Sequence, residues 1–179
     1  MGRIQHERDA FVYCGKVSSF DSAHFRAVLA HVPTSVVVVT GLDTRSEPHG
    51  ITIGSFTSVS LDPPLVGFFP GLNSQSWPLI EAGGSFCVNV LSSAQSELCW
   101  KFAKEADDRF AGIDWSAAPS GSPILDGCLA WIDCTIHSVT EVGDHYFVVG
   151  RVEHLTSTDP TADAMVFFGG KVTSVGRSE

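Results

Sequence analysis

Short apolar runs separated by polar turns dominate the chain and predict mainly β structure. Residues 36–40 form a β-branched run without a polar interruption, which predicts a strand buried on both faces. The polar segment 42–48 then predicts a turn. Two more apolar runs, 65–69 and 86–91, predict further buried strands, the first ending at Pro70-Gly71.

The second half of the chain predicts longer strands. Residues 128–139 and 145–155 have β composition and flank the connection 140–144, a pattern typical of a hairpin. A last strand is expected at 165–168. Residues 114–127 contain Gly, Pro and Ser and predict a loop.

Three segments have helical character. Near Asp21-Ser22 a helix can begin, because Phe25, Val28, Leu29 and Val32 have the i, i+3, i+4, i+7 spacing of an apolar helix face. A second helix is expected to begin just after Ser76, with Pro78 in its first turn. Residues 94–104 predict a third, amphipathic helix.

About seven strands with three helices between them predict a mainly β fold, an antiparallel barrel with peripheral helices. A chain of 179 residues is most simply one domain. We assign residues 21–175 to that domain. Residues 1–20 are weakly patterned, and we interpret them as an N-terminal extension.

Residues 49–65 carry the pattern most specific to function. Polar and apolar side chains alternate from Ser55 to Leu61, and Pro63-Pro64 is expected to end this strand with an extended exit. Gly54 would let a ligand approach the backbone closely. Five hydroxyl residues lie within nine positions and no charge lies among them: Thr52, Ser55, Thr57, Ser58 and Ser60. These residues alone fit an exposed polar strand face and a site for a planar, polar-edged ligand equally well.

The start of the second helix is a candidate anion site. A helix N-terminus presents unpaired backbone N–H groups and the positive end of the helix dipole, which together bind phosphate. Ser74 and Ser76 lie just before this helix. Simple helix capping explains the two serines equally directly, and from the residues alone it is the preferred interpretation.

The composition narrows the function classes. The net charge of −9 argues against nucleic acid as a principal partner, because phosphate binding needs clustered Lys and Arg. A charged fraction of only 17% suggests that apolar surface is covered by association, so a homo-oligomer is expected. The odd number of cysteines without a C-x-x-C pair predicts reduced core thiols and a cytoplasmic protein. No signal peptide or membrane span is expected.

Common catalytic and cofactor motifs are absent from the sequence. It has no G-x-G-x-x-G, no P-loop and no H-E-x-x-H. A nicotinamide cofactor would therefore not be held by a Rossmann unit. The seven histidines have no metal-ligand spacing, so no metal site is expected and a metal hydrolase is disfavoured.

The segment from Gly50 to Leu65 resembles the signature G-x-T-x-x-S-F-x-S-V-S-L-x-P-P-L of the flavin reductase domain family, the FMN-binding split barrels. The resemblance extends over roughly residues 22–172. Asp108-Arg109-Phe110-Ala111-Gly112, Pro123-Ile124-Leu125-Asp126-Gly127 and Gly143-Asp144-His145 also match family patterns. The chain is most similar to reductase components of two-component flavin-dependent monooxygenases, of the type called nitrilotriacetate monooxygenase component B or steroid-ring hydroxylase reductase.

This resemblance implies an antiparallel split β-barrel, usually a homodimer, that reduces FMN or FAD with NADH or NADPH. The reduced flavin would supply a separate monooxygenase. His145 would lie over the flavin ring and contact the nicotinamide, although a lone His at a strand start is by itself usually structural. Ser74 and Ser76 would hold the phosphate. The residues implied to bind the cofactor are Thr52, Gly54, Ser55, Phe56, Thr57, Asn73, Ser74, Gln75, Ser76, Asn89 and Phe110.

Two positions depart from the family pattern. Gln75 stands where Arg is common, which removes one charge-assisted phosphate contact. Val172 replaces an aromatic residue that many members have. Two alternatives therefore remain open: a flavin-binding carrier or sensor without reductase activity, and an assembly partner of an oxygenase that binds no flavin.

Overall fold

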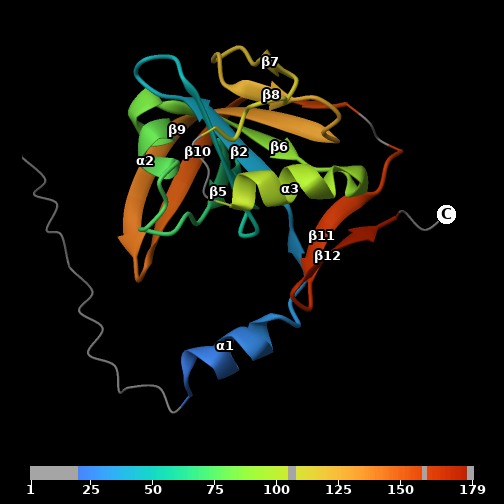
Figure 1. The fold of residues 1–179 in the computed structure, drawn as a ribbon. Coiled ribbons are helices and arrows are strands. Elements are labelled where there is room, and N and C mark those ends of the chain that lie inside the picture. The colour runs from blue at the N-terminus through green and yellow to red at the C-terminus, as the bar shows by residue number, and fades with distance from the viewer. Residues whose placement is uncertain (1–19, 105–107, 159–160, 177–179) are drawn as a thin grey trace, which may run out of the picture.

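The computed structural model describes residues 20–104, 108–158 and 161–176 (Figure 1). The expected extension, apart from Phe20, and Cys14 lie outside the described residues. The largest sheet has seven antiparallel strands in the order β3-β2-β6-β9-β10-β5-β4. Their bounds are β2 Val37–Leu42, β3 Pro48–Ile53, β4 Thr57–Leu61, β5 Pro64–Phe68, β6 Ser85–Val90, β9 Ala130–Val142 and β10 His145–Ser157. The prediction of a mainly β, antiparallel fold is confirmed.

Two smaller sheets complete the β structure. One contains β1 (Thr34–Ser35), β11 (Ala164–Phe168) and β12 (Lys171–Val175), and the other pairs β7 (Trp115–Ala117) with β8 (Pro123–Leu125). The prediction of a loop over residues 114–127 was therefore wrong in part. Strands of two or three residues are too short to show periodicity, and their pairing depends on tertiary contacts.

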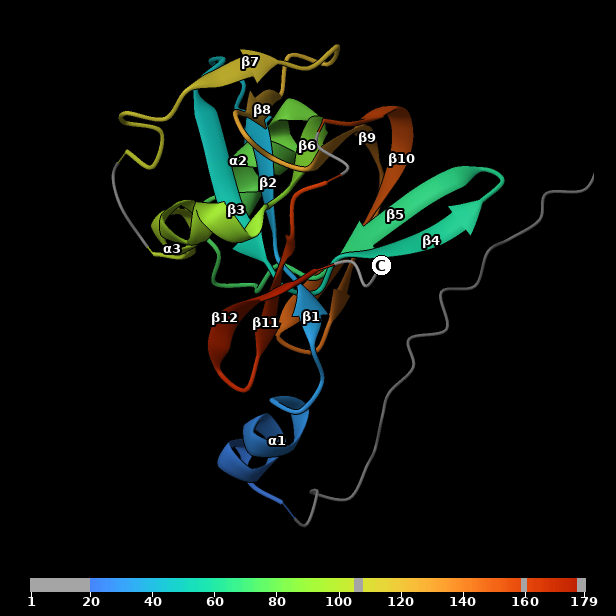
Figure 2. The same cartoon turned by 90° about the vertical axis from the view of Figure 1, so that its right-hand side faces the viewer.

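The exit from β4 also differs from the prediction. Instead of continuing in an extended direction, the chain reverses at Asp62-Pro63, and β4 pairs with β5 in a hairpin with Leu61 opposite Pro64. The Asp62–Pro63 peptide bond is cis. The missing N–H of Pro63 does no harm in a turn, where no ladder partner needs it. The hairpin projects from the barrel in Figure 2.

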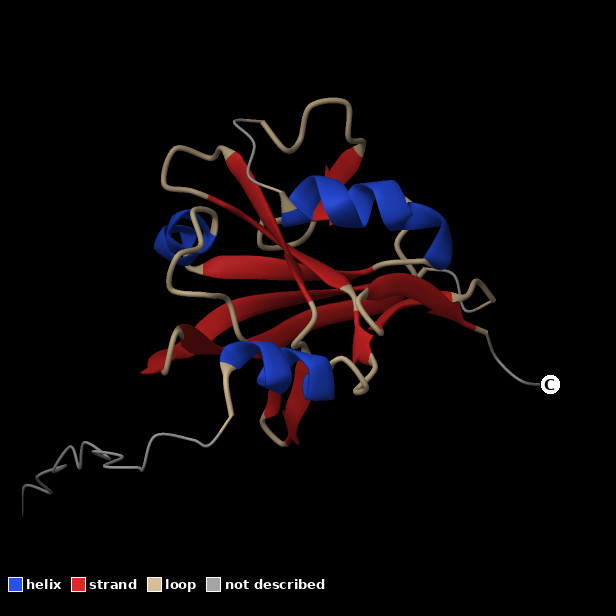
Figure 3. Cartoon of the chain, turned by 60° about the horizontal axis from the view of Figure 1, so that its bottom comes forward, coloured by secondary structure: helices blue, strands red, loops and turns tan. Residues whose placement is uncertain are grey.

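Helices lie on the outside of the strands (Figure 3). α2 (Trp77–Gly83) and α3 (Ser96–Ala103) both pack against β2 and β3, and the short 3-10 helix Ser93–Gln95 precedes α3. α1 (Ser22–Leu29) begins at Asp21, whose side chain accepts the His24 N–H at 2.7 Å. α1 lies below the barrel in Figures 1 and 2.

The strand β2 separates two apolar clusters. Val37 and Val39 belong to the cluster that contains Phe68, Trp77 and Phe86. Val36 and Val38 belong to a second cluster under α3, with Phe102 and Leu125. Successive side chains of a strand point to opposite faces, so the valine run is buried on both sides, as its composition predicted.

Candidate functional site

The strand β3 has an open backbone edge beside the most distinctive stretch of the sequence. β3 and β4 are the two edges of the seven-stranded sheet, and the residues Gly54, Ser55 and Phe56 connect them. An edge strand presents alternate N–H and C=O groups that no neighbouring strand uses. The seam of the barrel therefore offers backbone donors and acceptors next to Gly54.

One pocket, the His145 pocket, opens at this seam. Its volume is about 970 Å³ and its lining is mostly apolar. Its walls come from α1, from residues 51–55, from residues 69–71 after β5, and from the tip of the β9–β10 hairpin. The structure thus brings together four residues that the sequence analysis placed in one site: Thr52, Gly54, Ser55 and His145.

The hairpin tip that carries His145 is fixed to the loop after β5. Gly71 and His145 form a β-bridge. On either side, the Leu72 N–H donates to the Asp144 carbonyl at 3.0 Å and the Tyr146 N–H donates to the Pro70 carbonyl at 2.9 Å. The short turn between the strands contains Gly143, whose φ of 64° favours glycine. The imidazole is therefore held at the pocket by the backbone on both sides.

Asp144 orients the imidazole of His145. Its Oδ1 lies 2.6 Å from His145 Nδ1, and this hydrogen bond lowers the pKa of the Asp144 carboxyl. A carboxylate only accepts hydrogen bonds, so His145 Nδ1 carries the proton and Nε2 is free to face a ligand. Both side chains are accessible, because His145 is 47% and Asp144 95% exposed.

A second pocket, the Arg109 pocket, has a volume of about 680 Å³. Arg109 Nη1 donates to the Ser76 hydroxyl at 2.6 Å and to the Gly50 carbonyl at 2.9 Å. In the described part of the chain Arg109 Nε is buried and makes no hydrogen bond. The guanidinium is thus held through Nη1 against Ser76, the residue just before α2. The pocket therefore has a fixed cation in Arg109, although Gln75 stands where the family commonly has an arginine.

The turn between β2 and β3 forms the outer rim of the Arg109 pocket. Asp43 holds this turn, since its Oδ1 accepts the Arg45 and Glu47 N–H groups at 2.8 and 2.9 Å. The Glu47 hydrogen bond, with those of Arg45 and His49, lowers the pKa of Asp43 to about 2. Its Oδ2 lies 3.3 Å from Arg45 Nη2 and 3.4 Å from His49 Nε2. The ionised carboxylate thereby keeps two basic side chains at this pocket.

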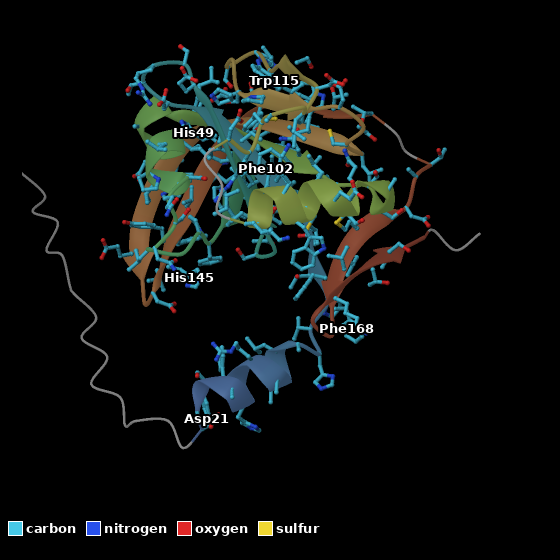
Figure 4. The ribbon with its side chains drawn as sticks, in the orientation of Figure 1. Asp21, His49, Phe102, Trp115, His145 and Phe168 are labelled. Carbon is cyan, nitrogen blue, oxygen red and sulfur yellow. The ribbon has the colours of Figure 1, made fainter. Side chains whose placement is uncertain are left out.

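The two pockets lie next to each other, because two segments of the chain, β3 and the loop before α2, each line both of them. Successive residues of β3 line first the Arg109 pocket (Pro48, His49, Gly50) and then the His145 pocket (Ile51, Thr52, Ile53). The loop before α2 does the same in reverse, with Gly71 in the His145 pocket and Gln75 in the Arg109 pocket. Figure 4 places His49 near α2 and His145 at the hairpin tip. One elongated ligand can therefore follow β3 from one pocket to the other.

Asn89 does not join this site, which corrects its expected role. It is fully buried on β6. Its amide donates to the Val38 carbonyl at 3.2 Å and to the Thr40 hydroxyl at 3.0 Å, and its oxygen accepts the Leu125 N–H at 2.8 Å. Asn89 fastens β8 to β2 and β6 and is inaccessible to a cofactor.

Other expected residues take modified positions. The Thr52 hydroxyl donates to the Cys99 carbonyl at 2.7 Å, so its proton ties β3 to α3. Ser74 Oγ, and not Ser76, accepts the Trp77 N–H at 3.1 Å as the side-chain cap of α2. Phe56 packs against the first apolar cluster. The Thr57 hydroxyl donates to the neighbouring Ser58 carbonyl.

Two remaining residues lie close to the pockets. Asn73 is exposed on the loop that joins them, near Gly71. Phe110 lines the Arg109 pocket but is only 9% exposed, and its ring packs edge-on against Phe102 with centroids 5.1 Å apart. Phe110 therefore contributes a mostly buried ring to the pocket lining, and its packing against Phe102 fixes the backbone next to Arg109.

Other chemistries find little support in the described residues. The thiols of Cys87, Cys99, Cys128 and Cys134 are free and buried, and burial raises the pKa of Cys134 to about 12, far from that of a reactive thiolate. Among residues 20–104, 108–158 and 161–176, no three His, Cys, Asp or Glu side chains are grouped as metal ligands would be. None of the helices described there is long and apolar enough to span a membrane.

Comparison with known proteins connects this geometry to one family. Residues 29–176 match the flavin reductase like domain. A flavin reductase of Pseudomonas putida is 48% identical over 86% of this chain and 89% of its own. The reductase subunit of a flavin-dependent monooxygenase from Rhodococcus jostii is 43% identical over 88% of this chain and 80% of its own.

Solved structures agree with the sequence matches. Nitrilotriacetate monooxygenase component B from Mycobacterium thermoresistibile superposes with a TM-score of 0.81 at 42% identity, covering 86% of each chain. An NADH:FAD oxidoreductase of Streptomyces globisporus, solved with NAD and FAD fragments, has a TM-score of 0.81 at 36% identity over 89% of this chain and 95% of its own.

Proposed function

The chain belongs to the flavin reductase family of split β-barrels, and from this membership we propose how its two pockets divide the work of binding flavin and nicotinamide. The protein is a flavin reductase of the kind that serves two-component monooxygenases. A bound flavin accepts a hydride from the nicotinamide. The protein has to bind the two rings face to face, and no strong general base is required.

The Arg109 pocket binds the phosphate of the flavin. Arg109 supplies the positive charge that Gln75 does not, and Ser76 and Gly50 hold the guanidinium in place before the ligand arrives. The Trp77 N–H at the start of α2 already donates to Ser74 and Pro78 has no N–H, so the positive charge of Arg109 carries the anion binding. Arg45 and His49 line the rim of the same pocket, where they would contact the additional phosphate of a dinucleotide such as FAD.

The His145 pocket receives the flavin ring. The polar edge of an isoalloxazine ring needs donors and acceptors in its own plane, which the free backbone edge of β3 and the Ser55 region offer. Donors there stabilise the negative charge that reduction places on the ring. His145, with Nδ1 held by Asp144, directs Nε2 toward the carboxamide of the nicotinamide. The binding and orienting residues are thus His145, Gly54, Ser55 and the backbone of Thr52.

The observation that carries this assignment is the continuity of the two pockets along β3. A flavin mononucleotide has an anionic end and an aromatic end joined by a flexible chain, and the two pockets have the matching character in the matching order. Neither pocket alone would distinguish a flavin from a simple anion or a simple aromatic compound.

We also propose that the protein is a homodimer that passes reduced flavin to a separate oxygenase. The β4–β5 hairpin exposes Leu61 by 95% and Val59 by 45%, and apolar side chains on a projecting hairpin are typical of surfaces that another subunit covers. Sedimentation of the purified protein tests the dimer. A monomer at all accessible concentrations would contradict it.

Anaerobic mixing with flavin and reduced nicotinamide tests the activity. FMN and FAD are each combined with NADH and NADPH, and loss of the visible flavin absorbance is followed. Bleaching far above the protein-free rate is expected, and the four combinations reveal the cofactor preference. Flavin binding without bleaching would indicate a carrier, and neither binding nor bleaching would indicate an assembly partner of an oxygenase.

A further inference from the structure

The apolar face of α1 is not packed into the barrel. Phe25 is 49%, Val28 53% and Leu29 49% exposed, and no residue of this helix is buried. Amphipathic helices normally gain their stability by burying such a face. Within the described residues the face stays about half exposed, so it is suited to contact a ligand or another molecule.

Two of these side chains form a wall of the His145 pocket. Phe25 and Leu29 are one turn apart on the same side of α1, and both line the pocket that residues 51–55 also line. Val28, at almost the same exposure, does not line it. The pocket therefore combines the polar edge of β3 with an aromatic and an aliphatic side chain from α1.

α1 is anchored close to its C-terminal end. The Ala30 carbonyl accepts the Gly169 N–H at 2.9 Å, and Thr34 pairs with Phe167 of β11. The Ser35 hydroxyl lies 3.5 Å from the Phe56 carbonyl beside the seam. These contacts fix the position from which α1 leaves the barrel, beside the pocket that Phe25 and Leu29 line. Figure 2 shows α1 below β1, β11 and β12.

We infer that Phe25 and Leu29 bind the flat face of the aromatic ring in the His145 pocket, so that α1 is the second wall of the ring site. This inference rests on the proposed flavin function. A planar ring is matched by in-plane donors at its edge and by apolar contact over its face. β3 provides the donors, and α1 provides the apolar contact. The sequence pattern identifies both residues only as part of an apolar helix face.

Binding of riboflavin tests the inference, because riboflavin has the ring without the phosphate. Phe25→Ala and Leu29→Ala are compared with Val28→Ala, which removes a similarly exposed apolar group from the same helix outside the pocket. Quenching of riboflavin fluorescence gives the Kd. Phe25→Ala is expected to raise it about tenfold, Leu29→Ala less, and Val28→Ala by no more than about twofold. Phe25→Tyr, which keeps the ring, is expected to restore most of the affinity.

Three results would contradict the inference that Phe25 and Leu29 contact the aromatic ring. Unchanged riboflavin affinity in Phe25→Ala, with normal binding by the unmodified protein, removes α1 from the site but leaves the flavin function intact. Equal losses in Phe25→Ala and Val28→Ala, together with a change in sedimentation, would make the face a subunit contact. Absence of riboflavin and FMN binding in the unmodified protein would overturn both the wall and the flavin function.

Discussion

Arg109 donates a 2.6 Å hydrogen bond to the hydroxyl of Ser76, the residue just before α2. The same Nη1 donates to the Gly50 carbonyl. Removal of Arg109 should therefore weaken a phosphate-bearing flavin more than one without phosphate. A lost charge-assisted hydrogen bond corresponds to about 1.5–3 kcal/mol, so Arg109→Gln should raise the Kd for FMN at least about tenfold.

Riboflavin is the matched ligand for this variant, and its Kd should stay within about twofold. Both values can be measured by fluorescence quenching at low and high salt. The salt dependence of FMN binding should also weaken in Arg109→Gln, because one fixed cation is gone. An equal loss for the two ligands would remove the phosphate role of Arg109.

Gln75→Arg should act in the opposite direction. Gln75 lines the same pocket as Arg109 and is exposed, so an arginine there can add a second cation without disturbing packing. The Kd for FMN should fall about threefold to tenfold, with no change for riboflavin. Weaker FMN binding in the variant would place the phosphate elsewhere.

His145→Ala should slow hydride transfer more than it weakens flavin binding. Its imidazole is expected to position the nicotinamide, and a misplaced reactant lowers the rate without removing flavin contacts. Stopped-flow bleaching at saturating NADH should show a decrease of about tenfold or more in the rate constant. Unchanged turnover at saturating concentrations of both ligands would contradict this role.

Asp144→Asn should give a milder version of the same defect. The carboxylate holds His145 Nδ1 at 2.6 Å. Because the pKa of Asp144 is lowered by this hydrogen bond, the carboxylate stays ionised down to pH values below its ordinary 3.8. The variant should lose rate at neutral pH while its flavin affinity stays unchanged. A rate equal to that of the unmodified protein would show that His145 needs no orienting partner.

Asn89→Ala should lower stability and leave the chemistry intact. The substitution leaves the buried Leu125 N–H and several acceptors around β2 without partners, which costs about 2–4 kcal/mol. Urea unfolding gives the stability loss, and FMN titration of the folded variant at low temperature should give the original Kd. A large loss of FMN affinity in the folded variant would return Asn89 to the binding site.

Asp43 should make the free energy of unfolding depend on pH in the acidic range. Its pKa falls from 3.8 to about 2 on folding, so its contribution is complete above pH 3.8 and disappears as the pH falls to about 2. Asp43→Asn should therefore lower the Tm at pH 7, and the difference from the unmodified protein should shrink below pH 3.8. A difference in Tm that is constant from pH 7 to pH 2 would contradict this.

The sequence predicted the features that depend on local pattern. The valine run before Thr40, the hairpin around Gly143-Asp144 and the caps of α1 and α2 all follow from periodicity, turn chemistry and capping. The three-residue strands β7 and β8 could not be predicted in this way, because three residues are too few to show a period and the pairing of Trp115 with Leu125 depends on tertiary contacts.

The site was predictable where a motif gathers its residues, as in residues 52–55. It was not predictable where residues distant in sequence meet. Arg109 reaches Ser76 and Gly50 only through the fold, so an expectation drawn from Gln75 alone left this cation out. For Asn89 the resemblance implied a place near the cofactor. In the structure its amide instead donates to the Thr40 hydroxyl and accepts the Leu125 N–H within the core.

The strand β3 also sets a fixed distance between the two pockets. A strand advances about 3.3 Å for each residue, so the distance along it from Gly50, beside Arg109, to Ile53 at the seam is fixed at about 10 Å. The hydrogen-bonded register of β3 with β2 keeps that interval constant. The protein would thus select ligands by the length of the chain between their anionic and aromatic ends, and a flavin analogue with a shortened linker would reach one pocket or the other, never both.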